Sequence, residues 1–201
     1  MSAIICNIIS ILTFKRRTTI IKSHIGKRIW IIGTSGTGKT TLAKIICQSL
    51  NLTHYELDEY FWGPEWTKLD EGEFLDKISR ICTLEQWVID GLYMQAKDII
   101  TNQVDTIIWL DFKIQLILYR IIVRTFKNLI NRKQLWNGNR ENIIHIFSDF
   151  IPFIIRTYRK NRKSNTELFK KLNERVCCIR IETVNEFNSL INTLNNESKQ
   201  N

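Results

Sequence analysis

Glycines, a lysine and threonines at close spacing are the part of this sequence best suited to chemistry. They form the run Gly33-Thr34-Ser35-Gly36-Thr37-Gly38-Lys39-Thr40-Thr41, which reads G-x-x-x-x-G-K-T over its first eight positions. Glycines there let consecutive backbone N–H groups point inward and hold phosphate oxygens. Lys39 can reach the β- and γ-phosphates of a nucleoside triphosphate, and the Thr40 hydroxyl can coordinate Mg²⁺. The run predicts a site for ATP or GTP with Mg²⁺.

The segments on either side have the patterns that such a phosphate-binding loop requires. Residues 28–32 form a short, β-branched apolar run, typical of a buried parallel strand. Residues 39–50 place apolar side chains at helical spacing, and Asn51 stands where that helix should stop. The alternative is a glycine-rich turn that happens to precede a lysine, and it would not require a strand before the turn or a helix after it. Strand, loop and helix together favour the nucleotide site.

Four further apolar runs predict the rest of a sheet. They cover residues 54–57, 86–91 (closed by a turn), 106–111 and 176–181. The intervening patterns predict a helix capped by Thr67, a long helix over about 114–130, and a last helix opened by the capping box Thr183-x-x-Glu186. Strands that alternate with helices predict an α/β, three-layer P-loop NTPase fold. Its five-stranded parallel sheet would place ligands at the carboxyl ends of the strands.

The length of 201 residues fits one such domain, which we expect to span residues 27–195 with a helical lid at about 125–163. Residues 1–26 are interpreted as an extension outside the fold or as the product of an upstream start codon, and residues 196–201 as a disordered tail. The apolar part of the extension is too short to span a membrane, and its positive charges follow it, unlike those of a secretory signal. Five cysteines without C-x-x-C spacing favour core residues in a reducing cytoplasm over a zinc site. We therefore expect a cytoplasmic protein without a membrane partner.

The net charge of +9 hides a polarised chain. Residues 51–90 hold ten acidic and three basic residues, a balance of −7. Residues 113–163 hold twelve basic and two acidic residues, a balance of +10. Charge separated in this way predicts two sites with different electrostatic tasks.

Arginines in the basic block are candidate catalytic residues beside Lys39. Arg120 and Arg124 are four residues apart, so they project from one helical face. Converging cations beside a triphosphate would stabilise charge on the transferring oxygens. The alternative is a solvated helix face. Arg140, in the polar lid segment 131–141, and the basic stripe at residues 156–163 are compatible with phosphate contact on closure and equally with a plain basic surface.

Two aspartates end neighbouring predicted strands in the acidic block. Carboxylates at Asp58 and Asp90 can hold Mg²⁺-bound water or orient an acceptor, and the alternative is a pair of strand-terminal turn residues. Trp62 and Trp66 could stack on a planar substrate, but packing is the favoured interpretation.

A wider resemblance rests on tryptophan-rich blocks that follow the loop. They are Leu57-Asp58-x-x-Phe61-Trp62-x-Pro64-x-Trp66, Trp87-Val88-Ile89-Asp90-Gly91-x-Tyr93, Asp105-Thr106-Ile107-Ile108-Trp109-Leu110-Asp111, Arg120-x-x-x-Arg124-Thr125 and Leu135-Trp136-Asn137-Gly138-Asn139-Arg140-Glu141. From about residue 27 to 190 the chain resembles the adenylate-kinase-like P-loop proteins often labelled DNA topology modulation proteins, within the nucleoside monophosphate kinase superfamily.

The resemblance implies a five-stranded parallel core with a closing lid, an Asp-Gly beside the loop and arginines that clamp the transferring phosphoryl group. Asp90-Gly91 and the pair Arg120/Arg124 stand at matching places. The chain departs from the pattern at Leu92-Tyr93-Met94, where nucleoside monophosphate kinases usually have Phe-Pro-Arg, and lacks the usual proline after the fourth strand.

These departures bear on the phosphoryl acceptor. A nucleoside monophosphate would need arginines in its pocket, but Arg80 is the single arginine of residues 51–90. The sequence therefore predicts an NTP-dependent kinase that acts on a small molecule through a hydroxyl or amine, with Asp58 or Asp90 as orienting base. Two alternatives stay open: a nucleotide-dependent regulator associated with DNA topology, drawing on the basic block, and an NTP hydrolase without a dedicated acceptor.

Overall fold

The computed structural model describes residues 25–131, 134–139, 142–172 and 176–197. Its centre is a parallel sheet of five strands in the order β2-β3-β1-β4-β5. The strands are β1 (Arg28–Gly33), β2 (His54–Glu56), β3 (Trp87–Asp90), β4 (Thr106–Leu110) and β5 (Cys177–Ile181). The chain therefore has the α/β fold with a five-stranded parallel sheet that its alternating pattern predicts.

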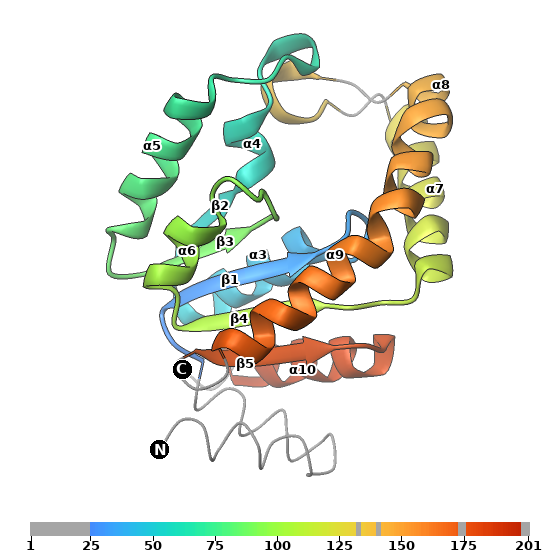
Figure 1. The fold of residues 1–201 in the computed structure, drawn as a ribbon. Helices are drawn as coiled ribbons and strands as arrows, with labels where there is room; N and C mark the ends of the chain where they lie inside the picture. The colour runs from blue at the N-terminus through green and yellow to red at the C-terminus, as the bar shows by residue number, and fades with distance from the viewer. Residues whose placement is uncertain (1–24, 132–133, 140–141, 173–175, 198–201) are drawn as a thin grey trace.

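Helices and helical turns connect the strands, and most of the chain outside the sheet belongs to them (Figure 1). They are α3 (Lys39–Leu50), α4 (Leu57–Phe61), η1 (Pro64–Trp66), α5 (Glu71–Cys82), α6 (Lys97–Gln103), α7 (Ile114–Ile130), η2 (Trp136–Gly138), α8 (Ile143–His145), the π-helical turn η3 (Ile146–Phe150), α9 (Ile151–Leu172) and α10 (Val184–Glu197).

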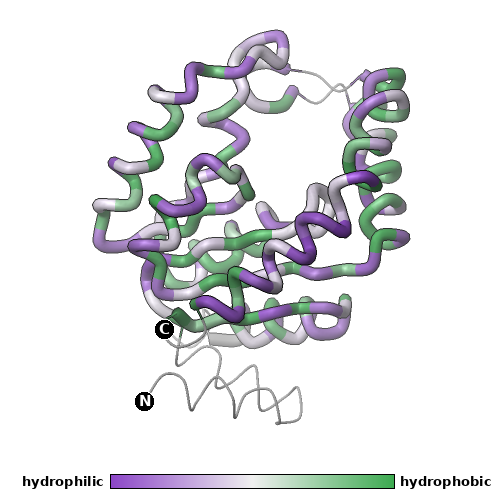
Figure 2. The backbone as a smooth tube through the Cα atoms, in the orientation of Figure 1, coloured by the Kyte–Doolittle hydropathy of each residue, from purple (hydrophilic) through white to green (hydrophobic). Residues whose placement is uncertain are grey.

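Each face of the sheet has its own apolar core, so the molecule has three layers. On one face, Ile29 and Ile31 of β1 pack with α3, α7 and α10. On the other, the alternate residues Trp30 and Ile32 pack with α5, α6 and the C-terminal half of α9. Because the central strands are buried on both faces, their sequences are largely apolar. Figure 2 shows the hydropathy of the residues along the sheet.

Local signals predicted most element boundaries, with one correction. Asn51 ends α3 in the left-handed conformation at φ 53°, as expected for a C-cap. In the capping box, the Glu186 N–H donates to Thr183 Oγ1 at 3.2 Å, and the Thr183 N–H donates to Glu186 Oε2 at 3.1 Å. The Thr67 cap is wrong: Asp70 caps α5 by accepting from the Glu73 N–H at 3.1 Å.

The described fold begins slightly before residue 27. Ile25 packs against the first core, and the Gly26 N–H donates to Thr106 Oγ1 at 2.9 Å. Residues 1–24, most of the expected extension, lie outside the described residues. At the other end α10 continues to Glu197, and residues 198–201 also lie outside them. Among the helices described, none is both long and apolar enough to cross a bilayer.

Candidate nucleotide and acceptor site

The loop after β1 wraps the N-terminus of α3, which is where a phosphate would be held. Gly33, Gly36 and Gly38 have φ of 149°, 83° and 97°, and Gly38 is the N-cap of α3. These φ values lie in a region that favours glycine. With this backbone conformation, the loop N–H groups gather at the N-terminus of α3, where the helix dipole is positive. The run at residues 33–40 therefore has the backbone conformation that a phosphate cradle requires.

Close packing against α7 fixes the middle of this loop. A Cβ at Gly36 would lie 2.8 Å from Ile121 Cγ1 and 3.2 Å from the Ile117 carbonyl oxygen. Thr37 is fully buried and its hydroxyl donates to the Thr34 carbonyl at 2.8 Å. Thr37 therefore shapes the loop from inside, whereas the other eight residues between Gly33 and Thr41 line the cavity.

Cations from two elements meet at the loop. Lys39 Nζ donates to the Thr34 carbonyl at 3.4 Å, and Arg120 Nη1 donates to the Thr37 carbonyl at 2.9 Å. The Arg120 guanidinium also lies 4.9 Å from the centre of the Phe112 ring. Burial lowers the pKa of Arg120, but a guanidinium stays charged at any physiological pH. Arg124, one turn further along α7, lines the same cavity.

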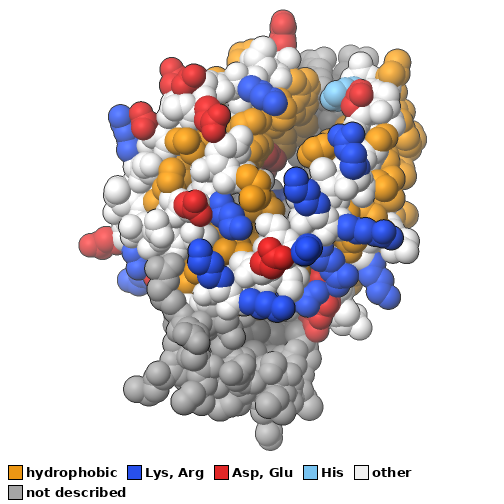
Figure 3. Space-filling view, viewed as in Figure 1, with side chains coloured by type: hydrophobic (Ala, Val, Ile, Leu, Met, Phe, Trp, Pro, Cys, Tyr) orange, Lys and Arg blue, Asp and Glu red, His pale blue; other side chains and the backbone are white. Residues whose placement is uncertain are grey.

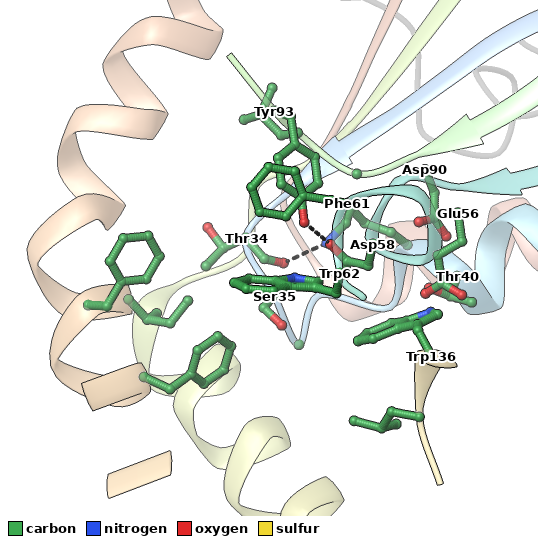
Figure 4. A pocket seen from close by; sticks show the side chains of 18 of the residues that line it. Thr34, Ser35, Thr40, Glu56, Asp58, Phe61, Trp62, Asp90, Tyr93 and Trp136 are labelled. Atoms are coloured by element: carbon green, nitrogen blue, oxygen red, sulfur yellow. Dashed lines mark hydrogen bonds between the residues drawn. The ribbon is translucent and has the colours of Figure 1, made fainter. Parts of the chain in front are cut away.

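Carboxylates from β2, α4 and β3 face the loop from the other side (Figure 4). Glu56 and Asp90 are register partners at the carboxyl ends of β2 and β3, and Asp58 follows two residues after Glu56. The Thr40 hydroxyl donates to Glu56 Oε1 at 2.9 Å. The structure thus places Asp58, Asp90 and Thr40 on one cavity together with Glu56, a residue that no sequence motif marks.

The two predicted aspartates have different partners. Asp90 is 2% exposed and lies 3.1 Å from Nε2 of His54, a residue that sequence reasoning missed. Asp58 accepts a hydrogen bond of 2.5 Å from the Tyr93 hydroxyl and is partly open to the cavity. Burial raises the pKa of Tyr93, and the Asp58 charge raises it further, so Tyr93 stays a protonated donor. Asp58 is therefore the more accessible carboxylate.

Glu56 has a shifted acidity. Burial raises its pKa, hydrogen bonds from the Trp136 and Thr40 side chains lower it, and the Asp90 and Asp58 charges raise it again. Like charges gathered at one place disfavour ionisation of each other. A cation between these carboxylates would relieve that repulsion.

Residues 134–139 form a strap across the top of the cleft, where the teal and yellow-orange segments meet in Figure 1. Asn139 is 4% exposed; its Nδ2 donates to the Gly63 carbonyl at 2.9 Å, and its Oδ1 accepts from the Trp66 N–H at 2.9 Å. Asn137 Nδ2 donates to the Trp62 carbonyl at 2.5 Å. The polar lid segment is thus anchored to the loop around η1, and its predicted catalytic residue Arg140 lies outside the described residues.

The basic stripe on α9 lies largely outside the cleft. Arg156 lines the cavity, whereas Arg159, Lys160 and Lys163 are exposed elsewhere on the helix. In Figure 3, Lys and Arg side chains spread over this face and are mixed with acidic ones. Of the stripe, Arg156 is thus the member that lines the cavity, and the other three lie on a surface of mixed charge.

The cavity between these walls has a volume of about 1980 Å³. Figure 3 shows the hollow with hydrophobic side chains inside it. The P-loop, α7 and α9 form one wall, and β2, α4, η1 and the residues after β3 form the other. Its size suits a nucleotide together with a second small molecule.

The donor set fits Mg²⁺ held together with a triphosphate. The Thr40 hydroxyl and the Glu56 and Asp90 carboxylates are oxygen ligands of the kind Mg²⁺ prefers, and this ion is usually held by a few side chains plus phosphates and water. No cluster of three or more His, Cys, Asp or Glu side chains among the described residues forms a metal site by itself. The residues therefore fit Mg²⁺ that is carried by a nucleotide.

Comparison with known families agrees with the loop geometry. The model of the "ATPase family associated with various cellular activities (AAA)" matches residues 29–111, which run from β1 to the end of β4. The protein YqaC of Bacillus subtilis (strain 168), described as uncharacterized, is 29% identical over 107 residues, 52% of this chain and 60% of that protein. A shikimate kinase of Azobacteroides pseudotrichonymphae genomovar. CFP2 is 32% identical over 79 residues, 38% of this chain and 45% of that enzyme.

The chain thus spans less than two thirds of either relative, and the matches support a P-loop, kinase-like nucleotide-binding protein in general terms. Among solved structures, a gluconokinase from Sinorhizobium meliloti 1021 has a TM-score of 0.47 at 14% identity, covering 88% of this chain and 95% of that one. A shikimate kinase from Acinetobacter baumannii in complex with shikimate has a TM-score of 0.43 at 14% identity, covering 88% and 98%. At these values the substrates of those two enzymes say nothing about this chain.

Proposed function

We propose that this protein is a phosphotransferase that moves the γ-phosphoryl group of Mg·ATP or Mg·GTP to a hydroxyl of a small-molecule acceptor. The observation that carries the proposal is the pairing of two unlike walls across one cavity. A loop of backbone N–H groups with Lys39 and Arg120 faces the carboxylates Asp58 and Asp90. The first wall suits a polyanion, and the second suits a group that must lose a proton.

On the phosphate wall the chain supplies binding and charge stabilisation. The loop and the N-terminus of α3 would hold the β- and γ-phosphates, with Lys39 as a mobile positive charge. Arg120 and Arg124 would follow the charge that develops on the transferring oxygens. Thr40 and the carboxylates of Glu56 and Asp90 would hold the Mg²⁺ of the nucleotide, which would supply neutralisation of the phosphate charge.

On the acceptor wall Asp58 is the proposed general base. The acceptor oxygen would form a bond to the γ-phosphorus while the bond to the β–γ bridging oxygen breaks, releasing the nucleoside diphosphate. The hydroxyl proton would pass to the Asp58 carboxylate, which Tyr93 holds by a 2.5 Å hydrogen bond. Asp90, fixed against His54 and almost fully buried, would position the acceptor or metal-bound water instead.

A nucleoside monophosphate fits this wall poorly, although the resemblance to adenylate-kinase-like proteins favours one. The described lining residues between 54 and 95 include four carboxylates, at residues 56, 58, 59 and 90, and one basic residue, Lys68. A dianionic phosphate would need arginines in place of these acids. The proposed acceptor is therefore neutral or cationic.

The regulator of DNA topology and the plain hydrolase remain the alternatives. The exposed Arg159, Lys160 and Lys163 could contact nucleic acid, but acidic side chains are interspersed on the same face (Figure 3). A hydrolase that transfers the phosphoryl group to water needs no binding site for a second small molecule, so the acceptor wall argues against this alternative. A reducing cytoplasm is the proposed location, since Cys47 and Cys82 are thiols that form no disulfide.

The test follows Mg·ATP and Mg·GTP turnover by ³¹P NMR with a panel of neutral polyols, amino alcohols and nucleoside monophosphates. We expect a phosphate ester to appear with a neutral or cationic acceptor, and Lys39→Ala to abolish it. Phosphorylation of a nucleoside monophosphate alone would contradict the acceptor assignment. Release of inorganic phosphate whatever acceptor is added would support the hydrolase. Steeply salt-dependent DNA binding at physiological ionic strength would support the regulator.

A further inference from the structure

Three tryptophans surround one corner of the cavity on the acceptor wall. The ring of Trp66 lies 5.8 Å from that of Trp62 at an interplanar angle of 80°, and 6.3 Å from that of Trp136 at 76°. Trp66 is thus nearly perpendicular to both neighbours. Figure 4 shows Trp62 and Trp136 as flat rings on the acceptor side of the loop. All three side chains line the cavity, and we call this group the tryptophan box.

These three tryptophans differ from the other three of the chain. Trp30 and Trp87 are completely buried and Trp109 is 2% exposed, so their task is packing. The members of the box are only partly buried and border open space. Packing alone would place large aromatic side chains in an apolar core, as it does for the first set, which lies in the core on one face of the sheet.

Backbone contacts hold the box in place before any ligand binds. Trp62 pairs with Lys68 in a short antiparallel bridge, and the Gly63 N–H donates to the Thr67 carbonyl at 2.7 Å. The strap adds Trp136 from a distant part of the chain, through the hydrogen bonds of Asn137 and Asn139. Fixed aromatic faces lose little conformational entropy on binding.

The charge around the box is negative. Glu56 and Asp58 line the same cavity as the three tryptophans, and the Tyr93 hydroxyl, which also borders it, donates to Asp58. Aromatic ring faces carry a negative quadrupole, and a desolvated organic cation over such faces is stabilised. Aromatic faces and nearby carboxylates together are complementary to one ligand chemistry, a cation with an apolar shell.

We propose that the tryptophan box binds an organic ammonium group, so that the phosphoryl acceptor is an amino alcohol or an aminated sugar. The acceptor part of this proposal rests on the proposed phosphotransfer, whereas ammonium binding by the box does not. With the ammonium in the box, a hydroxyl of the same molecule lies on the Asp58 side. Its oxygen would bond to the γ-phosphorus, its proton would pass to Asp58, and the nucleoside diphosphate would leave.

The test compares choline with 3,3-dimethylbutan-1-ol, its neutral isostere, by titration calorimetry of the full chain at constant ionic strength. We expect choline to bind at least about tenfold more tightly, from cation–π attraction in a partly desolvated site. Trp66→Leu should remove this preference and Trp66→Phe should keep most of it. Tyr119→Leu, at an exposed aromatic outside the cavity lining, should leave it unchanged.

Equal binding of the two probes, no binding of choline, or an unchanged preference in a folded Trp66→Leu protein would overturn the proposal. A folded variant is recognised by an unchanged far-ultraviolet circular dichroism spectrum and a cooperative thermal transition. Choline that binds but yields no phosphate ester with Mg·ATP, while a neutral polyol does, would overturn the acceptor assignment and leave the phosphotransfer standing. Choline binding without any heat from Mg·AMP-PNP would confirm the box and contradict the proposed function.

Discussion

The two walls of the cleft present different parts of the chain to the cavity. The proposed phosphate wall presents main-chain N–H groups of one continuous loop, and glycines at residues 33, 36 and 38 make that backbone possible. The proposed acceptor wall presents side chains of segments 56–66, 90–93 and 134–139. The first wall carries positive charge and the second negative charge.

This difference divides the chemistry. A wall of amides and cations holds any polyphosphate, so it contributes little to the choice of acceptor. A wall of oriented carboxylates and aromatic rings discriminates by charge and shape. Variants of one wall should therefore change properties that variants of the other leave alone.

The largest separation is expected for Asp58→Asn. Removal of a general base lowers kcat by about 10²- to 10⁴-fold. The affinity for Mg·ATP should stay the same, because the side chain lies on the acceptor wall. Steady-state kinetics with titration calorimetry measures both values. Asp98→Asn on the exposed side of α6 is the control, and a parallel loss of nucleotide affinity in Asp58→Asn would contradict the division.

Gly36→Ala tests the phosphate wall. The new Cβ would lie 2.8 Å from Ile121 Cγ1 at a φ of 83°, so we expect strain and a clash against α7 together. Gly138→Ala in the strap has a similar φ of 77° but no atom within 4 Å of the new Cβ, which makes it a matched control for strain alone.

We expect the control to lose about 1–2 kcal/mol in the free energy of unfolding, as for a left-handed alanine. Gly36→Ala should lose more, and should weaken nucleotide binding as well. Urea denaturation measures the first effect and calorimetry the second. Equal losses for the two variants would show that α7 does not constrain the loop.

Asn139→Ala tests whether the strap belongs to the acceptor wall. It removes two hydrogen bonds to the loop around η1 and leaves buried partners unsatisfied, a loss of about 1–3 kcal/mol in local stability. We expect faster amide hydrogen exchange at residues 62–67 and 134–139 and a raised KM for the acceptor, with nucleotide affinity maintained. Unchanged hydrogen exchange at both segments would contradict the assignment of the strap to the acceptor wall.

The smallest effect is expected for the ionisation of Glu56. The pKa of Glu56 is raised in the folded chain, chiefly by burial. Glu56 therefore contributes favourably to stability at a pH below the pKa it has in the unfolded chain, and this contribution is lost as the pH rises through its pKa in the folded chain. Glu56→Gln should therefore raise the melting temperature of the Mg²⁺-free protein more at pH 7 than at pH 4. The variant should also weaken the stabilisation that Mg·ATP gives. A melting temperature that falls at pH 7 would contradict the sign.

The two walls also differ in how much of their structure could be predicted from the sequence. The phosphate wall is local: eight consecutive residues set its backbone, and the strand and helix around it follow from periodicity. The acceptor wall depends on contacts between residues that are distant in the sequence, and residue spacing does not predict such contacts. Glu56 gains its place from the β2–β3 register with Asp90, and Trp136 reaches it through the anchored strap.

The misplaced cap at Thr67 has the same origin. Thr67 closes the turn around η1, where its hydroxyl donates to the Pro64 carbonyl at 2.7 Å, and the helix starts three residues later at Asp70. A threonine in a turn and a threonine at an N-cap offer the same hydroxyl, so local pattern alone does not separate them.

The most direct test of the two-walled cleft is titration of the chain with Mg·AMP-PNP, comparing the natural sequence with Lys39→Ala. The account predicts measurable heat and one site for the natural chain, and a large loss of affinity for the variant. Absence of heat in the natural chain, or identical binding by the variant, would contradict it.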